Sequence, residues 1–238
     1  MQIMVTHSTL YLWLRPRMNC AQRLLAFDIR ITPTPAGTAE CLDQHGNLAL
    51  NARFDAATTE LRASQFTVGM LRANPFDYVL AGESLRLPLW YRDPLRTALA
   101  RHRTDAHVAD SVKQYAPAAA AGAQRNARAF LVMLWRNIFQ TYRQMIRPSG
   151  PPWASGQTLS SQEASCRDLA VRFCDVCRVM QIAARFVSAY ECAAVSNQDY
   201  YMHAWAVVYL PRIGWRGYDP SRGLGRLPSL SLQVENAA

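Results

Sequence analysis

Three residues with the chemistry of a thiol enzyme follow one another in the last third of the sequence. Cys166 lies in SCRDLAVRFCDVCR, His203 begins HAWAVVYL, and Asp219 ends GWRGYD, all within 54 residues. A cysteine can act as a nucleophile, a histidine as its base, and an aspartate as the group that orients the imidazole. We therefore predict that Cys166, His203 and Asp219 form a catalytic triad.

The residues around Cys166 predict that it opens a helix. Ser165 is a typical N-cap residue, and Asp168 is the acid expected to bond back to the cap. The first N–H groups of a helix have no partner within it, and this end carries partial positive charge. Both features favour a thiolate at Cys166, and the N–H groups could bind an oxyanion. Burial as a small apolar residue is the alternative for a cysteine considered alone.

The other cysteines carry no comparable signal. Cys174 and Cys177 form a C-x-x-C pattern inside the helix, on its apolar side, and no second pair of ligands accompanies them. We expect both in the core rather than in a metal or redox site. Cys20, Cys41 and Cys192 suggest no role, and the uneven spacing of the six cysteines does not indicate a disulfide framework.

A β-hairpin is predicted to bring His203 close to Asp219. Alternation in a strand places His203 and Trp205 on one face, and the turn is expected near residues 211–214. Asp219 stands directly before Pro220, which ends the strand because proline has no N–H for the ladder. Taken singly, the histidine could be structural and the aspartate a turn residue; the order of the three residues favours catalysis.

Composition indicates an ordinary globular protein. Of 238 residues, 50% are hydrophobic and 18% charged, and no apolar run approaches the roughly 18 residues needed to span a membrane. The first residues do not resemble a secretory signal, so a cytoplasmic location is expected. The net charge of +9 comes almost entirely from arginine, with Lys113 the only lysine. Because these arginines form no tract, nucleic-acid binding is disfavoured.

The pattern of elements predicts a β-rich region followed by an α+β region. Alternating runs and a hairpin around Gly46-Asn47 mark the first ninety residues as β-rich. Helical spacing marks residues 127–145 and 166–180, whereas the alanine-rich stretch 117–122 is expected to be a connector. Strands are predicted at 184–190, 203–210 and 214–219. A helix that carries a cysteine onto an antiparallel sheet is an α+β arrangement.

At these residues the chain resembles the bacterial transglutaminase-like family, whose members are often described as predicted cysteine proteases. CRDLAVRFCDVCR is similar to the family's nucleophile helix, HAWAVVYL to its histidine strand, and GWRGYDPSRG to its aspartate strand. HSTLY, RITPTP, DQHGN and NPFDYVL resemble the β-rich region that precedes this domain in bacteria.

The resemblance implies a transglutaminase/papain-like core at residues 91–238, in which a nucleophile helix packs on an antiparallel sheet. A small β-rich N-terminal domain at residues 1–90 precedes it. Cys166, His203 and Asp219 correspond to the family's triad, and no metal or organic cofactor is implied. Tyr200 lies where animal transglutaminases place a tryptophan near the acceptor tunnel, so it is a candidate substrate-binding residue, although packing is an equal alternative.

The sequence departs from the family pattern at several positions. Glycine is usual where this chain has Ser165 and Gln181, and threonine is usual at Ser221. Val207 stands where the family often has glutamate, and Ala189 replaces another glycine. The core also looks shortened after Asp219.

The leading prediction is an enzyme that transfers acyl groups from amide bonds, acting on a protein or peptide as protease, amidase or transglutaminase. The alternative is a catalytically degenerate binding module with the same fold. An arginine-rich RNA-binding protein is the third hypothesis. We expect neither a nucleic-acid partner nor a membrane partner.

Overall fold

A computed structural model of the chain describes residues 8–16, 22–43, 45–57, 60–71, 86–190, 202–222 and 232–234. The chain divides into two compact units. The first comprises Met1–Asn74, Ser188–Tyr200 and Leu230–Ala238, and the second comprises Pro75–Val187 and Tyr201–Ser229. The division between residues 90 and 91 that the sequence suggested stays a prediction.

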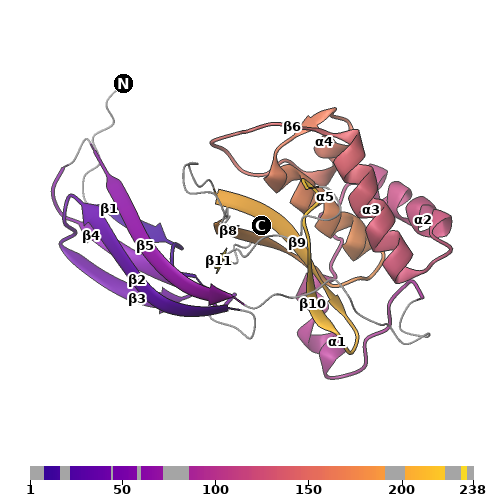
Figure 1. Ribbon diagram of the computed structural model, residues 1–238, viewed down its shortest axis with the longest axis horizontal. Coiled ribbons are helices and arrows are strands. Elements are labelled where there is room, and N and C mark those ends of the chain that lie inside the picture. The colour runs from indigo at the N-terminus through magenta and orange to yellow at the C-terminus, as the bar shows by residue number, and fades with distance from the viewer. Residues whose placement is uncertain are drawn as a thin grey trace. The chain divides into compact units, whose positions relative to one another are not determined.

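The first unit contains two antiparallel sheets formed by N-terminal strands (Figure 1). In one sheet β4 lies between β1 and β3, and in the other β2 pairs with β5. The predicted β-rich character of this region is therefore confirmed. The strand bounds are β1 Ser8–Leu12, β2 Gln22–Thr32, β3 Gly37–Leu42, β4 Leu48–Phe54 and β5 Arg62–Leu71.

The predicted hairpin at Gly46-Asn47 joins β3 to β4. The carboxylate of Asp43 accepts hydrogen bonds from the backbone N–H groups of His45 and Asn47, both at 2.8 Å. Gly46 takes a φ of 75°, a left-handed conformation that glycine adopts at little cost. The side chain of Asp43 thus fixes the turn that the sequence predicted. The segment NPFDYVL at residues 74–80, which resembles the family's N-terminal region, lies outside the described residues.

The second unit holds most of the main sheet and all the described helices. The sheet has the order β10–β9–β8–β11, and β9 and β10 form an antiparallel hairpin. β11 pairs with the Ser188–Tyr190 end of β8, so the segment after Asp219 contributes an edge strand. β6 and β7 form a short parallel pair. The bounds are β6 Arg143–Gln144, β7 Glu163–Ala164, β8 Ala184–Tyr190, β9 Met202–Leu210, β10 Gly214–Tyr218 and β11 Leu232–Val234.

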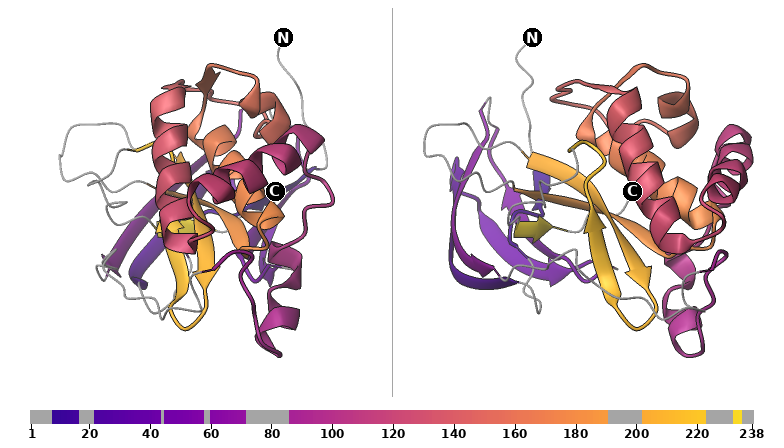
Figure 2. Two further views of the ribbon diagram at one scale, coloured as in Figure 1. Left: turned by 90° about the vertical axis from the view of Figure 1, so that its right-hand side faces the viewer. Right: turned by 45° about the vertical axis from the view of Figure 1, so that its right-hand side comes forward.

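Helix α5 (Cys166–Val179) is central to this unit. It packs on β9 and is contacted on its other sides by α2, α3 and α4 (Figure 2). The helix is amphipathic, and its apolar residues join one large core with side chains of α3 and β9. The predicted fold class is confirmed, because a cysteine-bearing helix lies on an antiparallel sheet. The remaining bounds are α1 Leu95–Ala98, the 3-10 turn η2 Ala100–His102, α2 Asp110–Gly122, α3 Ala127–Thr141 and α4 Ser155–Leu159.

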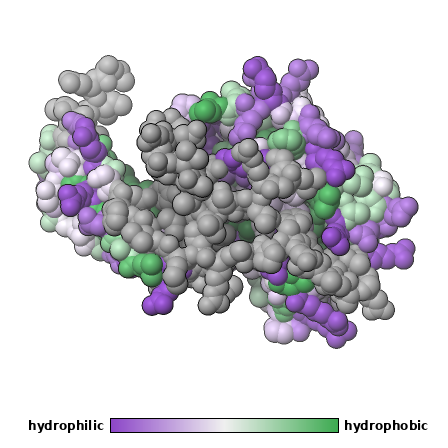
Figure 3. Space-filling view, viewed as in Figure 1, coloured by the Kyte–Doolittle hydropathy of each residue, from purple (hydrophilic) through white to green (hydrophobic). Residues whose placement is uncertain are grey.

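The prediction of a connector at residues 117–122 is wrong, because this stretch is the second half of α2. Alanine has the highest intrinsic helix propensity. Val112, Ala116 and Ala120 recur every four residues and bury one stripe of the helix. This stripe outweighs the lost backbone hydrogen bond at Pro117, which lies inside the helix. On the face seen in Figure 3, hydrophilic side chains gather over the helices of this unit.

Candidate active site

Cys166 is the first residue of α5, as the sequence predicts. Ser165 precedes it in an extended conformation, and its backbone N–H donates to the Asp168 carboxylate at 2.9 Å. The Ser165 hydroxyl donates to the same carboxylate oxygen at 2.6 Å. The predicted cap with its reciprocal acid is thus confirmed. It places the Cys166 sulfur at the helix end, where backbone N–H groups and the helix dipole favour negative charge.

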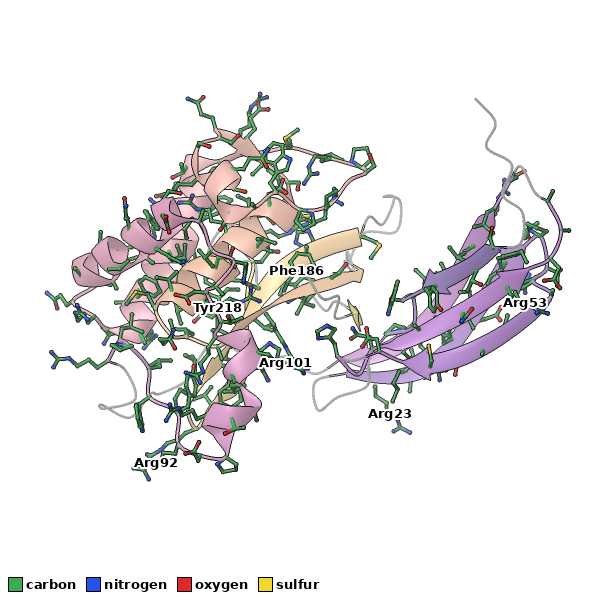
Figure 4. The ribbon with its side chains drawn as sticks, turned by 180° about the vertical axis from the view of Figure 1, so that it is seen from behind. Arg23, Arg53, Arg92, Arg101, Phe186 and Tyr218 are labelled. Atoms are coloured by element: carbon green, nitrogen blue, oxygen red, sulfur yellow. The ribbon has the colours of Figure 1, made fainter. Side chains whose placement is uncertain are left out.

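The thiol of Cys166 is partly exposed and lies against a small apolar cluster. Ala170, one turn further along α5, packs with Phe186 of β8 and Ala204 of β9, and Cys166 lies beside them. Figure 4 shows Phe186 on the sheet beside the helix. These contacts hold the first turn of α5 against the sheet, while Cys166 itself is only partly buried. Cys166 is therefore not a fully buried core cysteine, which was the alternative for this residue.

The β9–β10 hairpin brings His203 and Asp219 together. The strands pair antiparallel with Tyr218 opposite Ala206, and the turn after Leu210 falls at the predicted place. His203 Nε2 lies 2.6 Å from Asp219 Oδ2, and both residues are buried, with 8% and 1% exposure. The Cys166 side chain also interacts with the imidazole, and this interaction contributes to the raised pKa of His203.

The Asp219 carboxylate has further partners in the turn that follows it. Its Oδ1 accepts hydrogen bonds from the Ser221 N–H at 3.0 Å and the Ser221 hydroxyl at 2.6 Å. Arg222 Nε lies 3.8 Å from Oδ2. Ser221 stands where the family pattern has threonine, and its hydroxyl supplies the same kind of donor. This departure from the pattern leaves the carboxylate fully hydrogen-bonded.

These contacts change the protonation of His203. Burial by itself disfavours the charged imidazole, but the hydrogen bonds to Asp219 and Cys166, and the charges of both groups, raise the pKa of His203 to about 10. The imidazole therefore carries two protons at neutral pH, one facing the Asp219 carboxylate. A protonated imidazole beside Cys166 can donate a proton during a reaction at the sulfur.

A second acid, Asp168, forms hydrogen bonds that link the segment preceding α5 to the first turn of the helix, where the nucleophile lies. The Arg147 guanidinium donates to its fully buried carboxylate, and the Trp153 N–H donates to it at 2.7 Å. Although burial opposes ionisation, the hydrogen bonds from Ser165, Trp153 and Arg147 lower the pKa of Asp168 below its usual range. Arg167, next to Cys166, donates to the Gly150 carbonyl at 2.7 Å.

Sequence reasoning identified Asp168 as a cap but missed Arg147 and Trp153. Arg147 directly precedes PSGPPWASG and Trp153 lies within it, in a stretch interpreted only as a helix break. The signal available was one arginine next to a proline-rich break shortly before the nucleophile helix. That signal gives no partner for the arginine, because the pairing with Asp168 depends on how the chain returns to the helix.

Cys174 and Cys177 lie in the core, as predicted. They are 1% and 0% exposed, and burial raises the pKa of Cys174 to about 12 and that of Cys177 well above its usual value. Neither sulfur is suited to act as a thiolate. Among the described cysteines, Cys41, Cys166, Cys174 and Cys177 are all free thiols. Cys20, Cys192 and the candidate substrate-binding residue Tyr200 lie outside the described residues.

In the described part of the chain, no group of three or more histidine, cysteine, aspartate or glutamate side chains is arranged so that it could hold a metal ion. None of the helices described in the structure has the length and hydrophobicity that crossing a lipid bilayer requires. The arrangement of Cys166, His203 and Asp219 can support nucleophilic attack by sulfur with proton transfer through the imidazole.

Comparison with known protein families identifies the class to which this geometry belongs. Residues 113–220 match the transglutaminase-like superfamily, and residues 3–67 match the bacterial transglutaminase-like N-terminal region. The chain therefore belongs to the bacterial transglutaminase-like family, with a transglutaminase-like core and the N-terminal region that accompanies it. No curated protein matches the chain.

One of the similar solved structures supports the fold. A "putative cysteine protease" from Cytophaga hutchinsonii superposes with a TM-score of 0.68 at 15% identity, covering 98% of this chain and 77% of the other. The periplasmic domain of TgpA from Pseudomonas aeruginosa, bound to ethylmercury, gives a TM-score of 0.46 at 17% identity, covering 92% and 70% of the two chains. At these identities the first similarity shows the shared fold alone.

Proposed function

We propose that this protein transfers acyl groups from amide bonds through Cys166, with His203 and Asp219 as its partners in a triad. The observation that carries the proposal is the position of His203. Its Nε2 lies 2.6 Å from a buried Asp219 oxygen, and the same ring interacts with Cys166 at the N-terminus of α5. A thiol, an imidazole and an orienting carboxylate in this order are the parts that cysteine-dependent acyl transfer requires.

The proposed reaction begins with the thiolate of Cys166. The sulfur attacks the carbonyl carbon of a peptide bond or of a glutamine side chain, and a tetrahedral oxyanion forms. Backbone N–H groups in the first turn of α5, including that of Cys166, would donate to this oxyanion. His203 then gives its proton to the leaving nitrogen as the carbon–nitrogen bond breaks, which releases an amine or ammonia and leaves a thioester on Cys166.

The second half of the reaction returns the enzyme to its first state. Neutral His203 removes a proton from water or from an acceptor amine, which attacks the thioester carbonyl. Collapse of the second tetrahedral intermediate expels the Cys166 thiolate and leaves His203 protonated. Water gives a carboxylic acid and therefore hydrolysis, whereas an amine gives a new amide and therefore transamidation.

The raised pKa of His203 supports a particular resting state for this site. With the pKa at about 10, the proton lies on the imidazole at neutral pH before any substrate binds. His203 would therefore act as the general acid towards the leaving nitrogen. Asp219 would hold the ring with Nδ1 towards Cys166 and stabilise its positive charge.

The direct test is an assay that separates the two outcomes. A glutamine-rich protein such as casein is incubated with the protein and a fluorescent primary amine, and both label incorporation and released ammonia or new termini are measured. Covalent label indicates transamidation, and ammonia or new termini without label indicate hydrolysis. Cys166→Ala should abolish either product. The absence of both products from the wild type across a panel of protein substrates would support the binding-module alternative.

The substrate partner and the cellular location are further parts of this proposal. A protein or peptide is the proposed substrate, and neither nucleic acid nor a membrane is proposed as a partner. The cytoplasmic location expected from the sequence is tested by fractionation of cells that produce the natural protein. Recovery outside the cytoplasm would contradict it.

A further inference from the structure

A tryptophan on α3 holds the turn that carries Asp219. The indole N–H of Trp135 lies 2.5 Å from the Asp219 carbonyl oxygen and 2.8 Å from the Arg222 carbonyl oxygen, so one donor is shared between the two acceptors. The Trp135 side chain is 4% exposed. These bonds join residues that are more than eighty positions apart in the sequence. The hairpin end is thereby fixed from a different element of the fold.

Aromatic contacts also link the ring of Trp135 to the helix that carries the nucleophile. It meets Tyr218 edge-on, with ring centroids 6.2 Å apart and an interplanar angle of 88°. Tyr218 in turn stacks on Phe173 of α5 at 5.3 Å and 24°. Figure 4 shows Tyr218 lying between the sheet and the helices. Tyr218 and Phe173 are 1% and 0% exposed, so they form a buried aromatic contact between Trp135 and α5.

Asp219 needs such a support because it lies just beyond the end of β10. The ladder between β9 and β10 ends at the pair Tyr218 and Ala206, and Pro220 cannot extend it. Ser221 bonds to the Asp219 carboxylate, but it belongs to the same turn and moves with it. The bond from Arg222 N–H to the Asp219 carbonyl at 3.1 Å is likewise internal to the turn. Among the described residues, Trp135 is the donor that forms hydrogen bonds with this turn from a helix.

We propose that Trp135 is a positioning residue, whose indole N–H holds the Asp219 carboxylate in register with His203 Nε2. Its effect on turnover rests on the function proposed above. Loss of this N–H should let the Asp219–Arg222 turn shift, which lengthens the contact to the imidazole. The imidazolium then loses part of its stabilisation, and the protonation of the His203–Cys166 pair changes with it.

The test replaces only the N–H group. Site-specific incorporation of 3-benzothienylalanine at position 135 keeps the shape of the ring but puts sulfur in place of the indole N–H, and Trp135→Phe is the simpler second variant. Trp215→Phe is the matched control, because Trp215 packs on Arg185 and Tyr209 instead of on the Asp219 turn. Thermal unfolding is measured for each variant to establish that it folds.

The main readout is the titration of His203 by NMR of protein with isotope-labelled histidine, with the signal assigned by loss in His203→Gln. We expect the pKa of His203 to fall by about one unit or more in both position-135 variants and to stay unchanged in Trp215→Phe. Turnover should fall about tenfold or more at pH 7 with KM within about twofold, because substrate contacts are not altered.

Two failures are distinguishable. A wild-type His203 that titrates at its ordinary pKa, in a protein without acyl-transfer activity, would overturn the proposed function itself. A raised wild-type pKa that is the same in the 3-benzothienylalanine variant would overturn the role of Trp135 and leave the proposed function intact. Equal changes in the Trp215→Phe control would assign the effect to general loss of packing and also overturn the positioning role.

Discussion

The two ends of helix α5 carry the same residue types in opposite environments. Cys166 in the first turn is partly exposed and interacts with His203, whereas Cys174 and Cys177 further along are buried in the core. Burial raises the pKa of Cys174 to about 12, so its thiol stays protonated at neutral pH. The position along α5 therefore decides the role of each thiol. The thiol in the first turn can react, and the two thiols further along pack in the core.

The acids of α5 show the same contrast. Asp168, near Cys166, accepts hydrogen bonds from Ser165, Arg147 and the Trp153 backbone, and these bonds fix the approach of the chain to the nucleophile. Asp175, in the second half, pairs with Arg178 at 3.2 Å and with the exposed His107 at 3.2 Å. The described residues of this unit thus contain two histidine–aspartate pairs, and of these two the pair on the β9–β10 hairpin also interacts with a cysteine.

The largest effect is expected from exchanging the two kinds of cysteine for alanine. Cys166→Ala should lower turnover at least about a thousandfold, because the nucleophile is gone, with little change in stability. Cys174→Ala should keep turnover within about twofold and lower the free energy of unfolding by about 1 kcal/mol, because a buried sulfur leaves a cavity. Amide turnover and urea unfolding measure the two effects. Equal loss of turnover in both variants would break the contrast.

The two histidine–aspartate pairs can be compared by one matched substitution. Asp219→Asn should lower kcat by about 10³–10⁴, because the amide no longer holds the charged imidazole in the required orientation. Asp175→Asn should leave kcat within about twofold, since His107 takes no part in the proposed reaction. Steady-state kinetics of both variants decide the matter. A kcat for Asp219→Asn near that of the wild type would show that the hairpin pair is structural.

The cap of α5 should appear in the pH dependence of stability. Asp168→Asn is expected to lower the free energy of unfolding by about 2–4 kcal/mol at pH 7, because Arg147 loses a buried counter-charge. The pKa of Asp168 is lowered in the folded protein, so its contribution is present above the unfolded value of about 3.9. That contribution disappears as pH falls through the lowered pKa.

Urea unfolding of the wild type and Asp168→Asn at pH 7 and at pH 3 therefore checks the sign of this effect. The difference between the two proteins should be smaller at pH 3. A difference that grows on acidification would contradict a carboxylate stabilised in its charged form. Asp175→Asn serves as the control for removal of a buried carboxylate elsewhere on the helix.

The smallest effect is expected at the C-terminal end of α5. Gln181 takes a φ of 58°, where the family pattern has glycine, and a side chain in this left-handed conformation costs about 1 kcal/mol or more. Its side chain recovers part of this cost through Arg103 at 3.3 Å. Gln181→Gly should raise the free energy of unfolding by less than about 1 kcal/mol, which is measured as a slightly higher thermal midpoint. Turnover should stay unchanged. A clear loss of stability would show that the Arg103 contact outweighs the strain.

Local patterns were sufficient to predict the elements that carry the site. The capping residues around Cys166 predicted the start of α5, and alternation with a proline-ended strand predicted the hairpin that joins His203 to Asp219. Both features are set within a few residues of the chain, so the sequence contains them directly. The antiparallel strands of the first unit were predictable for the same reason.

Long-range contacts and competing propensities account for what the sequence did not reveal. Trp135 and Arg147 act through partners 84 and 21 residues away, and no local pattern names those partners. The prediction of a connector at 117–122 is wrong because the buried stripe that continues through Ala116 and Ala120 outweighs the effect of Pro117. In each case the outcome depends on packing against α5 or on the return of the chain to it.

The reactivity of Cys166 at mildly acidic pH tests the central claim most directly. Intact protein is labelled with limiting iodoacetamide at pH 6, and mass spectrometry compares Cys166 with Cys41, an exposed free thiol of the first unit. We predict that Cys166 is alkylated at least about tenfold faster than Cys41, and that His203→Ala removes this advantage. Equal, slow labelling of both cysteines in the wild type would contradict the imidazolium–thiolate pair and the catalytic function built on it.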